Sequence, residues 1–165
     1  MQVAMSNSLL SSSENPVRSA PVARDACGMA VAANLLGDRW TLLILRESFY
    51  GVSRFDDLRA DLDIPRGILS ARLKALVTAG LLAKSPYRQG RERVRFSYQL
   101  TAKGQDLALT LIALMQWGER HLREGPSPVR VADRRTGASL TIALVTPQGQ
   151  AVAAQDVEFI VLQQS

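Results

Sequence analysis

The stretch that decides the fold of this chain is Ile64–Gly80, IPRGILSARLKALVTAG. Its leucines recur at i, i+4 and i+7, the spacing of a helical stripe that faces a core. They are Leu69, Leu73 and Leu76. Pro65 suits the first turn of this helix, where its missing N–H costs nothing, and Gly80 suits the left-handed position just past the end. The sequence therefore predicts a helix that is buried along one side.

The other side of this helix carries cations and hydroxyls, and Ile64–Gly80 contains no Asp or Glu. The polar residues concerned are Arg66, Ser70, Arg72 and Lys74. An ordinary solvated face usually mixes acids with bases. A helix that lies in the DNA major groove needs bare cations in front and a core contact behind. The stretch fits either description, so the surrounding sequence has to decide between them.

The positive charge of the chain is concentrated around this helix. The 165 residues carry a net charge of +5, and Ile64–Tyr98 holds eight basic residues and one acid, or +7. The remainder is therefore at −2. A composition of 47% apolar and 21% charged residues is that of a globular protein of about one domain. These numbers favour a polyanionic partner that binds one confined region.

The residue counts limit the chemistry that the chain can perform. The single Cys27 excludes an intramolecular disulfide and a cysteine-rich zinc site, and the single His121 removes the usual general base. We therefore expect no catalytic residues, no metal and no cofactor. No apolar run comes close to the length of about 20 residues that a membrane-spanning helix needs. The N-terminus does not resemble a signal peptide. We expect a cytoplasmic protein with no membrane partner.

The residues before the basic helix predict the first part of a helix-turn-helix. Residues 1–23 are rich in Ser, Ala and Pro and are expected to form a disordered arm. A helix follows from about residue 25, and Asp38 is expected to cap the next helix, which contains the apolar run from Trp40. Ser53, with Asp56 three residues later, predicts a capping box for a short third helix. A short link then leads into the basic helix, as in a helix-turn-helix.

The residues after the basic helix predict a hairpin. Leu82–Tyr87 is a plausible strand, Arg88–Glu92 is a turn, and Val94–Tyr98 alternates apolar with polar residues. A hairpin directly behind a helix-turn-helix makes a winged helix. An isolated basic hairpin is more often a solvated edge, since charges protect edges from aggregation. Its position after this helix favours DNA binding instead.

These elements define candidate DNA contacts. Arg66 is the first choice for reading a base, because a guanidinium pairs bidentately with guanine, and Ser70 is a second reader or a phosphate contact. Arg72 either contacts DNA or pairs with Asp56 or Asp57. The remaining cations are predicted to contact phosphates: Arg54, Lys74, Arg88, Arg91, Arg93 and Arg95.

A long helix capped by Thr101 is predicted from about Ala102 to Leu122. Its apolar face is broader than a small winged domain can bury, which predicts a partner helix from a second subunit; the alternative is packing wholly on its own domain. The expected dimer contacts are Met29, Leu107, Leu111, Leu114 and Met115. From Gly125 the sequence predicts a small β appendage. Its strands are expected at 129–131, 140–145 and 157–161, with turns at 136–137 and 147–149.

The order of motifs resembles the HxlR family of bacterial winged-helix transcription regulators, which is grouped with MarR-like proteins. The resemblance covers about residues 26–122. It rests on Cys27, Leu36–Leu45, Arg54–Leu58, Leu69–Leu76, Ala79–Leu81, Pro86–Tyr87, Tyr98–Thr101, Gly104 and Trp117–Gly118. It implies a homodimer, built on the first and last helices of residues 24–124, that binds a pseudo-palindromic operator. Some relatives carry an extension like residues 125–165, but the cysteine pairs found in some of them are absent here.

The resemblance also raises the question of a signal. In some relatives the cysteine at the position of Cys27 senses oxidants or electrophiles, although a lone helical cysteine is usually a buried apolar residue. Trp40, Tyr50, Met115 and Trp117 could line an effector cavity or belong to the plain core.

Together the sequence predicts an α+β winged helix-turn-helix protein with flanking dimerisation helices and a small C-terminal β appendage. It is expected to bind double-stranded DNA as a homodimer, as a repressor that an oxidant or small-molecule effector switches. Two alternatives remain: a winged-helix interaction module without specific DNA binding, and a thiol-dependent enzyme that uses Cys27.

Overall fold

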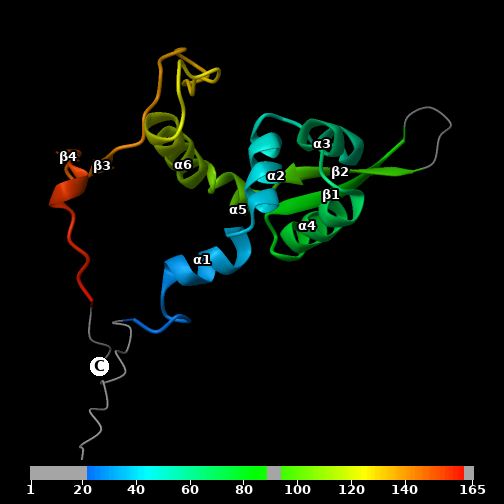
Figure 1. Cartoon of the computed structure of the whole chain (residues 1–165), viewed down its shortest axis with the longest axis horizontal. Helices are drawn as coiled ribbons and strands as arrows, with labels where there is room; N and C mark the ends of the chain where they lie inside the picture. The colour runs from blue at the N-terminus through cyan, green and yellow to red at the C-terminus, as the bar shows by residue number, and fades with distance from the viewer. Residues whose placement is uncertain (1–21, 89–93, 162–165) are drawn as a thin grey trace, which may run out of the picture.

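The computed structural model of the chain describes residues 22–88 and 94–161 (Figure 1). The predicted disordered arm falls almost wholly outside the described residues. The wing-tip residues Arg91 and Arg93 lie outside them as well. No helix in the described part of the chain is long and apolar enough to cross a membrane.

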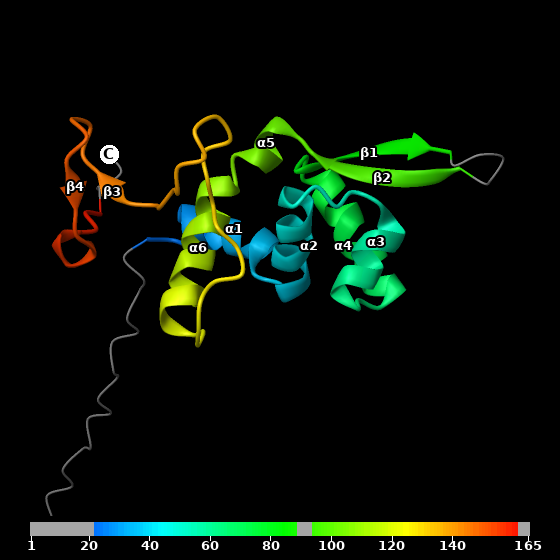
Figure 2. The same cartoon turned by 90° about the horizontal axis from the view of Figure 1, so that it is seen from above.

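The described chain contains six α-helices, two antiparallel strand pairs and one short 3-10 helix. The elements of the winged-helix part are α1 (Gly28–Leu36), α2 (Arg39–Phe49), α3 (Phe55–Leu62), α4 (Arg66–Thr78), β1 (Leu82–Tyr87), β2 (Arg95–Leu100), α5 (Ala102–Gln105) and α6 (Ala108–His121). The C-terminal part contains β3 (Leu144–Val145), β4 (Ala151–Val152) and η1 (Ala154–Asp156). Figure 2 shows α3, α4 and the hairpin at one end, with α1, α6 and the C-terminal part at the other.

Two helix boundaries confirm the sequence signals. Asp38 Oδ1 accepts hydrogen bonds from the backbone N–H groups of Trp40 at 3.0 Å and Thr41 at 3.2 Å, so Asp38 caps α2 as predicted. Helix α4 ends at Thr78, and Gly80 follows with a φ of +72° in the left-handed region. Pro65 is the N-cap of α4, one position before the first helical turn.

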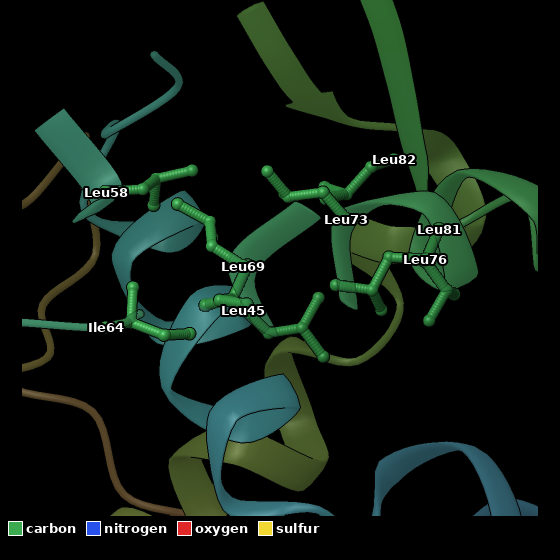
Figure 3. Packing of buried hydrophobic residues seen from close by; sticks show 9 residues of the cluster. Leu45, Leu58, Ile64, Leu69, Leu73, Leu76, Leu81 and Leu82 are labelled. Carbon is green, nitrogen blue, oxygen red and sulfur yellow. The ribbon is translucent and has the colours of Figure 1, made fainter. Parts of the chain in front are cut away.

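The core lies between α2, α3, α4 and the start of β1. It is formed by the buried side chains Ile44, Leu45, Leu58, Ile64, Leu69, Leu73, Leu76, Leu81 and Leu82. Figure 3 shows the leucines of α4 pointing toward those of α2 and α3. The predicted stripe of Leu69, Leu73 and Leu76 is thus buried, with 0 to 1% of each residue exposed. This core fixes which side of α4 remains for solvent.

The hairpin of the wing forms as predicted, but the predicted capping box does not. Strands β1 and β2 pair antiparallel from Leu82 opposite Leu100 to Tyr87 opposite Arg95. Helix α3 begins at Phe55 behind an N-cap residue, Arg54, that makes no side-chain capping bond. The backbone carbonyl of Ser53 accepts a hydrogen bond from the N–H of Tyr98 at 2.7 Å. Ser53 is therefore extended beside β2, which removes it from the capping position.

The prediction of one long helix is wrong, because the helix is interrupted at residues 106–107 and forms α5 and α6 instead. The Thr101 hydroxyl accepts a hydrogen bond from the Gly104 N–H at 3.1 Å, so the predicted cap is present on the short α5. Gly104 is buried against the backbone, and a Cβ added there would lie 2.2 Å from the carbonyl oxygen of Leu81. Helix α5 is thus held against the start of β1, and α6 leaves it in a new direction (Figure 2).

The C-terminal part is less regular than predicted. Strands β3 and β4 pair through the predicted turn at Gly149, while residues 129–131 and 157–161 contain no strand. The Gln116 side chain of α6 donates to the Leu140 carbonyl at 3.1 Å and accepts from the Ile142 N–H at 2.9 Å. A side chain therefore satisfies backbone groups that the predicted strand would have paired with a neighbour.

A tight loop lies before this segment. It runs from Asp133 to Gly137 and includes the predicted turn. The Asp133 carboxylate accepts backbone hydrogen bonds from Arg135 at 2.7 Å and Thr136 at 3.4 Å. These bonds lower the pKa of the Asp133 carboxyl group. An isolated bridge between Ala132 and Ser139 closes the loop.

Candidate nucleic-acid interface

Helix α4 exposes the side that its buried leucines leave free. Arg66, Ser70 and Lys74 are all exposed, and α4 contains no acidic residue. Ile68 is also 37% exposed on this helix, and its apolar side chain offers a contact for a thymine methyl group. The sequence did not identify Ile68 as a candidate DNA contact, because a β-branched apolar residue is usually assigned to the core. The arrangement presents cations, a hydroxyl and one apolar side chain from a rigid helix.

Arg66 is held near the start of α4 by an aromatic ring. Its guanidinium carbon lies 5.3 Å from the ring centroid of Phe55, the first residue of α3. A cation above an aromatic face is favourable at this distance. Phe55 thereby restricts the side chain that is the first candidate for base reading.

Arg72 does not pair with Asp56 or Asp57 as the sequence alternative predicted. Its Nε lies 3.0 Å from Asp38 Oδ1, and its Nη2 donates to Asp38 Oδ2 at 3.1 Å. Asp38 thus caps α2 and binds α4 with the same carboxylate. The pair links the start of the central helix to the basic helix.

Asp56 pairs instead with a cation of the wing. Arg95 Nη1 donates to Asp56 Oδ2 at 3.2 Å, which ties the first residue of β2 to the first turn of α3. Both side chains are about half exposed. The pair borders a hollow of about 440 Å³ between α4 and the wing, which Arg66, Ser70 and Tyr98 also line. Burial raises the pKa of the Tyr98 phenol.

Of the other residues that were predicted to contact phosphates, some lie within the part of the chain that the structure describes and others lie outside it. The Arg54 guanidinium carbon lies 5.1 Å from the ring centroid of Tyr87, and Arg88 is exposed directly after β1. Arg91 and Arg93 fall outside the described residues. The described cations come from the end of the molecule that holds α3, α4 and the wing (Figure 1).

The four residues predicted for an effector cavity do not gather in one place. Tyr50 and Met115 line a cavity beside α2, on the side away from the wing. Trp40 packs against the core and carries the Arg39 guanidinium 4.4 Å from its ring centroid. Trp117 is 51% exposed beside His121. Cys27 is the half-buried N-cap residue of α1 and makes no side-chain capping bond.

The residues predicted to form the dimer interface also differ in their surroundings: some pack against the core and others are exposed. Leu107 and Leu111 pack against the core of their own chain, as the alternative reading expected. Met29 and Leu114 are 79% and 48% exposed, and neither α1 nor α6 contains a fully buried residue. Met115 is half-buried. Leu109, which is 67% exposed on α6, was not among the predicted contacts.

The sequence of residues 35–126 matches the HxlR-like helix-turn-helix family. This chain belongs to that family. The protein is therefore a transcriptional regulator of the helix-turn-helix type, and the resemblance and the winged-helix fold predicted above are confirmed. Members of the family are in general not enzymes, and no enzymatic family is indicated.

Named relatives agree with this membership. The uncharacterized HTH-type transcriptional regulator Rv3095 of Mycobacterium tuberculosis is 43% identical over 129 residues, covering 76% of this chain and 80% of the relative. The uncharacterized regulator sll1512 of Synechocystis is 33% identical over 102 residues, covering 59% and 72%.

Two similar solved structures match different shares of this chain. PA1607, described as a candidate transcription factor, has a TM-score of 0.72 and 32% identity, covering 82% of this chain and 94% of its own. The Bacillus subtilis transcriptional regulator YodB, in its reduced form, has a TM-score of 0.50 and 26% identity, covering 61% and 98%. Residues 24–124 alone make up about the same share of the chain as the match to YodB covers. The likeness to PA1607 therefore includes part of the C-terminal extension.

Proposed function

We propose that this HxlR-family regulator is a homodimer that represses genes by binding a pseudo-palindromic operator. The observation that carries the proposal is the exposed, acid-free side of α4, which buried leucines hold from behind. Two such helices related by a two-fold axis would enter successive major grooves about 34–36 Å apart. Occupation of both grooves would then block polymerase.

The proposal assigns different tasks to the cations. Arg66 reads a base with Ser70 beside it, while phosphates are contacted by Arg54, Lys74, Arg88, Arg91, Arg93 and Arg95. Arg72 is better explained as a positioning residue, since Asp38 engages two of its nitrogens.

The dimer is assigned to α1 and α6, within a unit of residues 24–124 that residues 125–165 extend. Exposed Met29 and Leu109 would lie in the interface together with Leu114, Met115 and Trp117. Support comes from the absence of a fully buried residue in either helix. Large exposed apolar side chains on neighbouring elements are typical of interaction surfaces.

The experiment that tests base reading compares two exposed arginines. Arg66→Ala should weaken binding to the operator by about 1–3 kcal/mol and have little effect on random DNA. Arg88→Ala should weaken both and flatten the dependence of log K on log salt by about one unit. Footprinting of the DNA upstream of the gene identifies the operator, and fluorescence anisotropy measures both variants. If Arg66→Ala weakens operator and random DNA equally, base reading by Arg66 is wrong.

The same titration separates the alternative functions. An interaction module without specific DNA binding would give equal affinities for the upstream fragment and random DNA. A thiol-dependent enzyme would turn over an electrophile, and Cys27→Ser would abolish that turnover. A repressor predicts neither result.

Cys27 is assigned the part of a candidate redox switch within this function. It is the half-buried N-cap residue of α1, where a bulky or charged modification would disturb a helix of the proposed dimer. Diamide should then release the wild type from DNA and leave Cys27→Ser bound, and reduction should restore binding. A wild type that keeps its affinity while mass spectrometry shows Cys27 modified would contradict the switch.

A further inference from the structure

A cavity of about 520 Å³ lies on the side of α2 that faces away from the wing. Its walls come from α2, from α6 and from residues 129–131 of the C-terminal extension. Figure 2 shows the segment after α6, drawn in yellow, passing in front of that helix. The volume lies within the roughly 300–1,000 Å³ of small-molecule sites.

The lining of this cavity is mainly apolar and includes the aromatic residues Phe49 and Tyr50. The helices contribute Leu42, Leu43, Phe49, Leu111, Ile112 and Met115. Val129 and Val131 close the third side, so the cavity depends on the extension. An apolar or aromatic body is the ligand that such walls would accept.

Two cations and no acidic residue line the same cavity. Arg46 is paired with the buried Glu47, so its charge is already compensated. Arg130 Nη1 donates to two neutral acceptors, the Gly137 carbonyl at 2.8 Å and the Ser139 hydroxyl at 3.3 Å. No salt bridge within residues 22–88 and 94–161 includes Arg130. Arg130 thus lines the cavity with one guanidinium nitrogen held by neutral acceptors, and a guanidinium has further N–H donors that can bind an anion.

We propose that this cavity binds a small amphipathic acid, with an apolar or aromatic body and one carboxylate. The body would lie between α2 and α6, and Arg130 would bind the carboxylate. The positive charge of Arg130 would then select an acid over a neutral analogue of the same shape.

The position of the cavity gives the ligand a route to DNA binding, a step that rests on the function proposed above. Helix α2 contacts both α4 and α6. A ligand between α2 and α6 would change the angle between the proposed dimer helix and the basic helix. Because both basic helices must match grooves at fixed spacing, occupation of the cavity lowers operator affinity.

The binding test uses 2-naphthoate and its neutral isostere 2-naphthamide as probes. Isothermal titration of the full chain without DNA should show naphthoate binding at least tenfold more tightly. Arg130→Gln should abolish this difference, and the matched control Arg134→Gln, in the neighbouring 133–137 loop and outside the cavity lining, should retain it. Ala108→Trp should fill the cavity and prevent binding of both probes.

The outcomes separate the cavity from the DNA-binding proposal. Equal affinities of the wild type for the two probes, or loss of the difference in Arg134→Gln as well, would overturn the assignment of Arg130. Saturating naphthoate should lower operator affinity of the wild type at least tenfold and leave Ala108→Trp unchanged. Unchanged operator affinity with naphthoate bound would overturn the regulatory step. Naphthoate binding by a protein that binds no DNA would refute the proposed function and support the cavity.

Discussion

The two ends of the molecule differ in how their apolar side chains are covered. Around α4 a continuous core of buried leucines and isoleucines closes within a single chain. At the other end, α1 and α6 contain no fully buried residue, and Phe159 and Ile160 of the extension are 93% and 73% exposed. The DNA-binding end is therefore complete by itself, whereas the far end has apolar surface that a single chain leaves exposed.

This difference bears on how a regulator of this kind could work. A complete core holds α4 rigid, because packed interiors deform little. Exposed helices can instead take up different positions against a second subunit or a ligand. The central helix α2 joins the two ends, since it contacts α1, α3, α4 and α6.

The largest effect is expected from a core residue of α4. Leu73 is 1% exposed, and Leu73→Ala should lower the free energy of unfolding by about 2–5 kcal/mol, because it leaves a cavity among the packed leucines. The matched control Leu109→Ala, at a residue that is 67% exposed, should change it by less than about 0.5 kcal/mol in the monomer. Urea unfolding followed by circular dichroism at low protein concentration measures both. Equal losses would contradict the contrast between the two ends.

The next effect concerns the exposed helices. Met29→Glu combined with Leu109→Glu would place charges in the proposed apolar interface without touching the core. The dimer dissociation constant should rise at least 100-fold, which corresponds to about 2.7 kcal/mol. Sedimentation equilibrium measures this change, with Arg135→Glu in the exposed 133–137 loop as a charge control. A wild type that is monomeric at micromolar concentration would refute the dimer itself.

The helix-turn-helix and the hairpin were predictable from sequence because local signals determine them. The leucine spacing of α4, the Asp38 cap and the left-handed Gly80 act within a few residues. The break between α5 and α6 was not predictable from the same signals. It depends on Gly104 meeting the Leu81 backbone, which is a contact between distant parts of the chain.

The candidate site shows the same limit. The basic residues of α4 could be named from composition and spacing, and two of them, Arg66 and Lys74, lie exposed on this helix. Their partners could not be named, because Asp38 and Arg72 are 34 positions apart and Asp56 and Arg95 are 39 apart. From the sequence, Asp56 and Asp57 were the expected partners of Arg72, because the helix that contains them directly precedes α4. In the structure Arg72 instead pairs with Asp38, at the start of α2. The cavity also needed the fold, since its third wall comes from the extension.

The smallest effect separates two roles for Arg72. Its side chain and that of Asp38 are 41% and 31% exposed, so solvent screens the pair. A double-mutant cycle of Asp38→Asn and Arg72→Gln should give a coupling free energy of only about 0.5–1 kcal/mol in unfolding. Asp38→Asn is the suitable partner variant, because asparagine still caps a helix and only the charge is lost.

The same cycle measured on DNA decides the role. If Arg72 positions α4 through Asp38, each single variant should lower operator affinity by a similar factor and the double variant should add little. Random DNA should respond less, because phosphate contacts do not depend on the orientation of the reading side chains. If Arg72 contacts DNA itself, Arg72→Gln should weaken binding while Asp38→Asn, which removes a negative charge from beside the arginine, should leave binding intact or strengthen it. The carboxylate that caps α2 would then be a stabilising contact alone, and the ligand cavity would have to act on α4 through the core.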